Sequence, residues 1–139
     1  MDSAADIQRG VARALIDADY AVLSELPLAN GRRADLVAVD RAGRITVVEI
    51  KSCRADFLCD RKWQDYLGYC DHFYFAVGSD FPCDLLPADE GLIMADRFEG
   101  AIIREARVRP LDAARRKAML VRFAWASANR LHALTDPIP

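Results

Sequence analysis

The sequence predicts a mixed α/β domain in which helices pack around one β-sheet. Three observations favour this class: helix-type apolar spacing near the N-terminus, strand-type segments joined by tight turns in the middle, and a long helix-type segment near the C-terminus. The chain has 139 residues and is 53% hydrophobic and 29% charged, as in ordinary globular proteins. Because this length suits one domain, we expect residues 1–139 to fold as a single unit.

The first expected elements are a helix and an irregular strand. Ser3 is a suitable N-cap, and apolar residues recur at helical spacing from Ile7 to Leu15, so the helix should end near Ala18. Strand-type residues follow at 21–29. Pro27 interrupts this segment, which therefore predicts an edge strand or a bulged one.

Two further strands complete a meander. Asn30-Gly31 predicts a turn, after which residues 33–40 form the second strand. The segment Arg41-Ala42-Gly43 predicts a three-residue hairpin loop, with glycine where left-handed backbone is needed. Residues 44–52 are rich in β-branched side chains and form the third strand.

The second half of the chain alternates between helix-type and strand-type segments. A helix over much of 56–71 should bury Trp63 and Leu67. The remaining elements are expected as a buried strand at 72–77, an irregular link or helical turn between Pro82 and Pro87, strands at 91–95 and 101–105, and a long helix that begins at Pro110.

The expected C-terminal helix is both apolar and basic. Its apolar stripe consists of Leu111, Ala114, Ala118, Val121 and Trp125. Although the whole chain carries a net charge of −2, residues 104–130 contain eight basic and two acidic residues. Such a stretch either attracts phosphate or forms a solvated helix face. The basic residues are Arg104, Arg107, Arg109, Arg115, Arg116, Lys117, Arg122 and Arg130.

The hairpin around residues 41–43 places charged side chains together. If the loop joins Asp40 to Arg44, paired residues have numbers that add to 84, so Asp35 lies opposite Glu49. Opposed residues have Cβ atoms about 4.5–5.5 Å apart. Side chains alternate along a strand, so Glu49 and Lys51 share a face. The register therefore predicts a cluster of two carboxylates and one amine.

Two neighbouring carboxylates repel each other, and a divalent cation such as Mg²⁺ would offset this repulsion. With an adjacent lysine, the cluster fits metal-assisted phosphodiester hydrolysis. The alternative is a surface hairpin in which Lys51 bridges two exposed acids. The same acid-x-lysine pattern recurs at Asp60-Arg61-Lys62, which we expect on a helix, where residues two apart do not face each other.

These motifs resemble the PD-(D/E)xK nuclease superfamily, which includes restriction endonucleases, and more narrowly the bacterial MmcB DNA-repair family. The resemblance implies a restriction-endonuclease-like core, with a mixed sheet of four to six strands in αβββαβ order and a long C-terminal helix. The residue before the first acid is Ala34 rather than the proline of the superfamily name. The matching segments include Gly31-Arg32-Arg33-Ala34-Asp35-Leu36, Val48-Glu49-Ile50-Lys51-Ser52, Asp60-Arg61-Lys62-Trp63, Phe75-Ala76-Val77, Gly91-Leu92-Ile93 and Arg115-Arg116-Lys117-Ala118.

The resemblance implies roles for individual residues. Asp35 and Glu49 correspond to the metal-binding acids, and Lys51 corresponds to the catalytic lysine. Ile50, which follows Glu49 in the sequence, is a further metal-binding position. The expected cofactor is Mg²⁺ or Mn²⁺.

The superfamily often adds an acid from the first helix, for which Asp6 and Asp17 are candidates. Glu25 is an alternative on the first strand. A three-residue loop from Asn30 turns Glu25 toward the Asp35 side of the sheet, whereas a two-residue loop turns it away.

Four residues near the cluster are candidates for nucleic-acid contacts. Arg32 and Arg33 could hold a backbone phosphate, or they could be exposed loop charges. Lys62 and Tyr66, one helical turn apart, could border the site, or they could serve packing and solvation. Trp63 is expected in the core.

The favoured function is metal-dependent DNA cleavage in repair. The competing hypotheses are a non-catalytic DNA-binding or scaffolding protein with the same fold, and an unrelated interaction module that docks through the basic helix. DNA is the expected partner, with a second copy of the chain and other repair proteins as further candidates. An acidic N-terminus and the lack of a long uncharged run predict a cytoplasmic protein without membrane contact, whose four cysteines are reduced thiols.

Overall fold

The computed structural model describes residues 2–60 and 62–139. Helices and strands alternate as the periodicity predicts. The first helix begins with a capping box, in which the side chains of Ser3 and Asp6 each accept the backbone N–H of the other residue. The elements in chain order are α1 (Ala4–Asp17), β1 (Ala21–Pro27), β2 (Arg33–Val39), β3 (Ile45–Ile50), α2 (Arg54–Cys59), the 3₁₀ helix η1 (Trp63–Tyr69), β4 (His72–Val77), the 3₁₀ helix η2 (Cys83–Leu85), β5 (Gly91–Ala95), β6 (Gly100–Arg104) and α3 (Ala113–Thr135).

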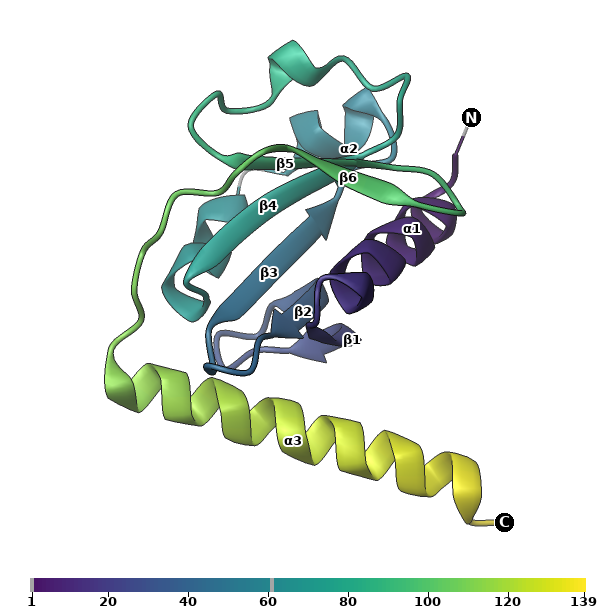
Figure 1. Ribbon diagram of the computed structural model, residues 1–139, viewed down its shortest axis with the longest axis vertical. Coiled ribbons are helices and arrows are strands. Elements are labelled where there is room, and N and C mark those ends of the chain that lie inside the picture. The colour runs from purple at the N-terminus through teal and green to yellow at the C-terminus, as the bar shows by residue number, and fades with distance from the viewer. Residues whose placement is uncertain (1, 61) are drawn as a thin grey trace.

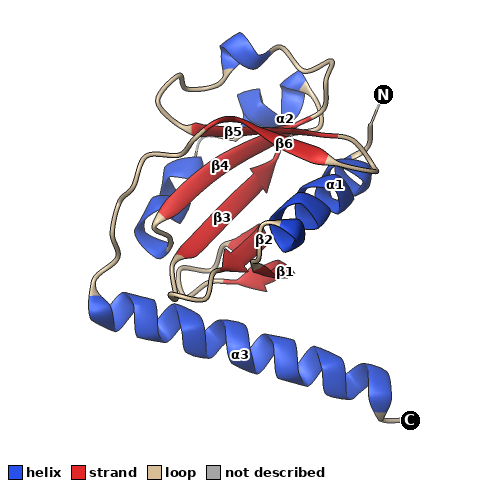
Figure 2. Cartoon of the chain, in the orientation of Figure 1, coloured by secondary structure: helices blue, strands red, loops and turns tan. Residues whose placement is uncertain are grey.

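The six strands form one mixed sheet whose spatial order follows the chain from β1 to β6 (Figures 1 and 2). The β1–β2, β2–β3 and β5–β6 pairs are antiparallel, whereas β3–β4 and β4–β5 are parallel. The helices flank this sheet, and α3 is the long C-terminal helix. The predicted α/β class, the αβββαβ order and the strand number are confirmed. No helix within the described ranges has the length and apolarity needed to cross a bilayer.

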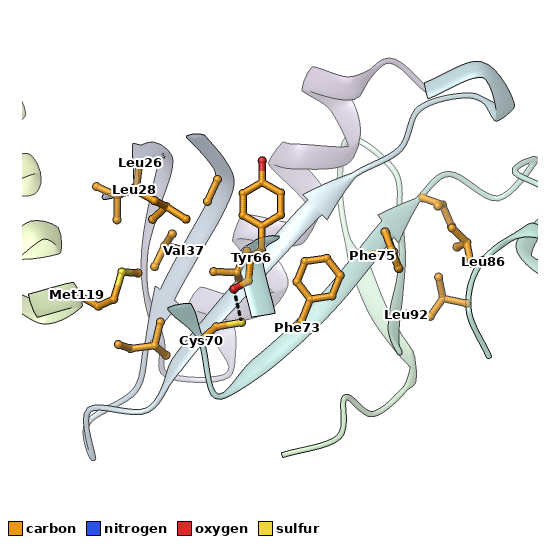
Figure 3. Close-up of a cluster of buried hydrophobic side chains, with 14 of the residues drawn as sticks. Leu26, Leu28, Val37, Tyr66, Cys70, Phe73, Phe75, Leu86, Leu92 and Met119 are labelled. Carbon is orange, nitrogen blue, oxygen red and sulfur yellow. Dashed lines mark hydrogen bonds between the residues drawn. The ribbon is translucent and has the colours of Figure 1, made fainter. Parts of the chain in front are cut away.

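Each face of the sheet has its own hydrophobic cluster. On one face, Ile7, Val11 and Leu15 of α1 pack against strand residues that include Leu36 and Val48. On the other face, Tyr66, Phe73 and Phe75 lie at the centre of a cluster that also receives Met119 from α3 (Figure 3). Because apolar side chains on both faces are buried, the central strands β3 and β4 are apolar almost throughout.

Trp63 belongs to the second cluster, as predicted. Its ring is stacked on Phe73 at a centroid distance of 5.7 Å and meets Phe75 edge-on at 5.2 Å. Such aromatic pairs add about 0.5–1.5 kcal/mol beyond the area that they bury.

The central hairpin has the predicted register. Leu36 pairs with Val48 and Val39 with Ile45, so residue numbers across the pair add to 84. Gly43 adopts a φ of +83° at the end of the loop, and the backbone N–H of Asp40 donates to the carbonyl of Arg44 at 3.1 Å. Extending this register by one residue places Asp35 opposite Glu49.

The hairpin between β1 and β2 differs from both predicted registers. Leu26 pairs with Ala34, so the connection comprises residues 28–32, closed by a bond from the Leu28 N–H to the Arg32 carbonyl at 2.7 Å. Glu25 stands opposite Asp35 in this register, but it makes no ladder pair, its φ is +51°, and its side chain is exposed. β1 is nevertheless an edge strand, as Pro27 indicates.

The helix expected over much of 56–71 is interrupted in the structure. The segment contains α2 and η1, separated by a break at Asp60, whose backbone is extended. The Asp60 side chain accepts the N–H of Lys62 and also binds Lys51 on β3. These bonds stabilise a non-helical conformation, because a short acidic side chain competes with helical hydrogen bonds.

Leu111 of the predicted apolar stripe packs against the core, but the rest of the stripe, on α3, is exposed. Val121 and Trp125 are 47% and 68% exposed, whereas Met119 is buried and Phe123 packs against the core. The helix begins at Ala113 behind the N-cap Asp112, rather than at Pro110. The helix therefore has two apolar stripes. The one that contains Met119 and Phe123 packs against the sheet, and Arg116 and Arg130 bind the body of the protein on that side.

The arginines of the basic stretch bind the body of the protein. Each of the seven arginines donates to a carboxylate or a backbone carbonyl, whereas Lys117 is exposed. Arg122 and Arg130 also cover the open edge of β1, which otherwise presents unpaired carbonyls. The contacts are Arg104 to the Pro87 and Glu90 carbonyls, Arg107 to Asp89, Arg109 to Glu90, Arg115 to the Gly68 carbonyl, Arg116 to Asp71, Arg122 to the Pro27 carbonyl, and Arg130 to the Ser24 and Glu25 carbonyls.

Substitution of Gly10 by alanine tests the packing of α1 against the β5–β6 turn. A Cβ at this position would collide with the carbonyl oxygens of Asp96 and Glu99, the latter at 2.6 Å. Because backbone must move, we expect the free energy of unfolding to fall by about 2 kcal/mol, measured by urea denaturation. Gly68→Ala is the control, since its Cβ would meet only the flexible end of Arg115 at 3.5 Å. Equal stability of the two variants would contradict the prediction.

Candidate active site

Asp35 on β2 and Glu49 on β3 lie opposite each other, one residue beyond the last paired residues of these two strands, Leu36 and Val48. The backbone N–H of Asp35 donates to Oε1 of Glu49 at 3.0 Å, and the N–H of Ile50 donates to Oδ2 of Asp35 at 2.8 Å. Each carboxylate therefore takes a backbone donor from the opposite strand. The two acids are held by main-chain atoms, which limits their movement.

Burial makes this pair electrostatically unfavourable. Glu49 is only 5% exposed, and Asp35 is half-buried. Burial and then the charge of Asp35 raise the pKa of Glu49 to about 8. The bond from the Asp35 N–H and the charge of Lys51 act in the opposite direction, but they are weaker.

Lys51 is buried and pairs with a residue that the sequence analysis did not select. Its Nζ lies 2.6 Å from Oδ2 of Asp60, and the two side chains are 8% and 19% exposed. Burial raises the pKa of Asp60, but the bonds from Lys51 and from the Lys62 N–H outweigh it and lower the pKa overall. Lys51 is therefore near the acidic pair but is bonded to Asp60.

The acid–lysine pattern at 60–62 was the available signal for Asp60. The helix expected over this segment would turn the ends of the triplet away from each other; its middle residue, Arg61, lies outside the described residues. Asp60 and Lys62 instead lie in the link between α2 and η1. The contact between Asp60 and Lys51 depends on this break in the helix, which periodicity did not predict.

The acidic pair has the donor chemistry of a hard-cation site. Asp35 and Glu49 each use one oxygen to accept a backbone N–H, and the two carboxyl groups also share a side-chain hydrogen bond, which raises the pKa of Glu49. The peptide of Ile50 adjoins both acids. Mg²⁺ typically binds one or two carboxylates and retains several waters, so this set fits it. The described residues contain no group of three or more His, Cys, Asp or Glu suited to a metal.

The other acidic candidates lie outside this pair. Glu25 is exposed, and its carboxylate lies 3.9 Å from Arg33. Asp6 caps α1 through the Ser3 N–H, and Asp17 is exposed at the end of that helix. The register places Glu25 opposite Asp35, but within the described residues Glu25 forms no metal-suited group with Asp35 and Glu49.

Of the predicted nucleic-acid contacts, Arg32, Arg33 and Lys62 reach the surface. Arg32 pairs with Asp65 at 3.2 Å and is 34% exposed, while the Arg33 side chain is 66% exposed. Lys62 is also exposed. These three cations lie on the segments that carry Asp35 and Asp60.

Tyr66 is instead buried at the border of the site. It is 8% exposed, stacks with Phe73 at 6.3 Å, and donates its hydroxyl to the carbonyl of Arg33 at 3.2 Å. Burial and the charges of Glu49 and Asp35 raise its pKa. Tyr66 thus holds the strand that carries Asp35 and is placed for packing rather than for contact with a surface ligand.

Comparisons with known proteins place this chain among relatives. A family model described as DNA repair protein MmcB-like matches residues 1–138. The solved structure of the SPO1766 protein of unknown function from Silicibacter pomeroyi is 42% identical, with a TM-score of 0.94 over 99% of this chain and 94% of that chain. A repair endonuclease from Pyrococcus abyssi is 20% identical, with a TM-score of 0.45 over 71% of this chain and 48% of that chain. No curated protein matches this chain.

Proposed function

Because this chain belongs to the MmcB-like DNA repair protein family, we propose that it is a metal-dependent nuclease of the PD-(D/E)xK type that cleaves DNA during repair. The observation that carries the proposal is the placement of two partly desolvated carboxylates, Asp35 and Glu49, beside a buried lysine. Two buried carboxylates without a bound cation would lower the stability of the fold, because burial removes water from their charges. A site that binds a cation and a phosphate explains why these groups lie together.

Each residue has a distinct role in this proposal. Asp35 and Glu49, with the main chain of Ile50, would hold Mg²⁺ or Mn²⁺. The bound cation would act as a Lewis acid toward a phosphodiester and an attacking water. Lys51 supplies a fixed positive charge for the phosphate in the transition state. Arg32, Arg33 and Lys62 supply sequence-independent attraction for the DNA backbone.

A cleavage panel tests this function. Purified protein is incubated with single-stranded, duplex, flapped and branched DNA in the presence of Mg²⁺ or Mn²⁺, beside Asp35→Ala, Glu49→Ala and Lys51→Ala. Cleavage by the parent that all three variants lose supports the proposal. Equal cleavage by all four proteins assigns the activity to a contaminant or another site. Salt-sensitive binding without cleavage that survives loss of the acids indicates the DNA-binding or scaffolding alternative.

Metal affinity should depend on pH through Glu49. Its pKa of about 8 means that this carboxyl is mostly protonated at pH 6 in the metal-free protein, and a ligand must be deprotonated to bind. We therefore expect Mn²⁺ affinity to rise by up to about tenfold from pH 6 to pH 7, with release of nearly one proton. Isothermal titration calorimetry in buffers of different ionisation enthalpy measures both quantities. Affinity that is constant over this range, without proton release, would contradict the assignment.

A further inference from the structure

We infer that Asp60 is a positioning residue that holds the ammonium of Lys51 in the candidate active site. This inference rests on the proposed nuclease function and adds a residue to its machinery. The supporting contact is the 2.6 Å bond between Lys51 Nζ and Asp60 Oδ2, between two side chains that are largely shielded from water.

The carboxylate of Asp60 is itself held in place. Its second oxygen, Oδ1, accepts the N–H of Lys62 at 2.9 Å, which leaves Oδ2 for the lysine. Asp60 is the C-cap of α2, and the start of the same segment is held by bonds from the Ser52 N–H and hydroxyl to Asp56. The carboxylate of Asp60, which is fixed by a backbone bond, therefore binds the end of the flexible Lys51 side chain.

Lysine requires such an anchor. Its ammonium is a compact charge on a stem of four carbons, and a buried ammonium needs a counter-charge. Without Asp60, the ammonium would be left near Glu49, two residues earlier along the chain, which the proposal reserves for a cation. Asp60 therefore gives Lys51 a fixed position and keeps its ammonium from occupying the acidic pair. Both carboxylate oxygens of Asp60 already accept hydrogen bonds, one from Lys51 and one from the Lys62 N–H, which separates its role from that of a metal ligand.

Kinetics of Asp60→Asn and Asp60→Glu test this role. Asparagine preserves the shape and removes the charge, so we expect kcat for DNA cleavage to fall by about 10–100-fold while KM changes by less than about threefold. Glutamate restores the charge and should recover at least part of kcat. Asp89→Asn is the matched control, because Asp89 is 80% exposed and pairs with Arg107 on the surface. An unchanged or increased kcat in Asp60→Asn would overturn the inference.

A second measurement separates this inference from the proposed function. An ammonium held in a buried ion pair exchanges its protons slowly, so its ¹H–¹⁵N correlation should be visible by NMR and assignable with Lys51→Arg. We expect this signal in the parent, in Asp60→Glu and in Asp89→Asn, and its loss in Asp60→Asn under conditions in which the backbone ¹H–¹⁵N spectrum shows that this variant is folded. If the parent lacks nuclease activity, these spectra still decide whether Asp60 fixes Lys51. Persistence of the signal in Asp60→Asn would refute positioning even if the parent cleaves DNA.

Discussion

Glu49→Gln is expected to abolish detectable DNA cleavage, with a loss of at least about 10³-fold in kcat/KM. The substitution retains the side-chain shape but replaces a charged metal ligand by a neutral amide. A cation held by Asp35 alone would bind weakly. Steady-state cleavage assays at several Mn²⁺ concentrations, combined with calorimetric titration of Mn²⁺, measure the two effects separately.

The same variant should be at least as stable as the parent. Glu49 is buried beside Asp35, and removal of its charge relieves both repulsion and desolvation. Since its folded pKa of about 8 lies above its ordinary value of 4.5, Glu49 lowers the stability of the metal-free parent as pH rises from about 4.5 to 8, and this penalty is constant above 8. We therefore expect Glu49→Gln to remove part of the parent's stability loss between pH 5 and pH 8. Glu99→Gln, an exposed position, is the control. Lower stability together with retained cleavage would contradict the assigned role.

Asp71→Asn is expected to lower the free energy of unfolding by about 3 kcal/mol. Asp71 is 3% exposed, and its two oxygens accept both terminal nitrogens of Arg116 at 2.7 Å. They also accept the N–H groups of Ile45 and Leu111 at 2.8 and 3.0 Å. One carboxylate thus connects β3, the segment before α3, and α3 itself. Asparagine leaves Arg116 without its counter-charge and cannot accept on both sides.

Urea denaturation of Asp71→Asn beside Asp89→Asn measures this effect. The Asp89–Arg107 pair lies on the surface, so its loss should change stability by less than about 1 kcal/mol. Burial raises the pKa of Asp71, but Arg116 and the two backbone donors outweigh it and lower the pKa to about 2. Its stabilising contribution is thus present above the ordinary value of 3.8 and is lost as pH falls toward 2. A parent and variant that differ equally at pH 2 and pH 7 would refute this assignment.

Elements governed by short-range rules were predictable from the sequence. The α1 cap depends on Ser3 and Asp6, which are three residues apart, and the β2–β3 register depends on a loop with glycine at its left-handed position. That register places Asp35 opposite Glu49, so two of the site residues followed from local turn chemistry. Lys51 followed from strand alternation.

Features that depend on competing partners were not predictable in this way. α3 carries two apolar stripes, and periodicity alone selected the one that contains Trp125. The ion pair of Arg116 with Asp71 and the bonds of Arg130 to the edge of β1 turn the other stripe inward. The break at Asp60 has the same origin, because its carboxylate binds Lys51 instead of continuing a helix.

The sequence by itself determined the order of helices and strands, the central hairpin register and the neighbouring positions of Asp35 and Glu49. These depend on periodicity and turn geometry that act over a few residues. Only the tertiary structure decided that the exposed carboxylate of Glu25 lies beside Arg33, that α3 packs through Met119 and its arginines, and that Asp60 pairs with Lys51. The physical reason is that a buried charge takes whichever counter-charge the folded chain brings within reach, and the periodicity of one segment carries no information about a partner on another.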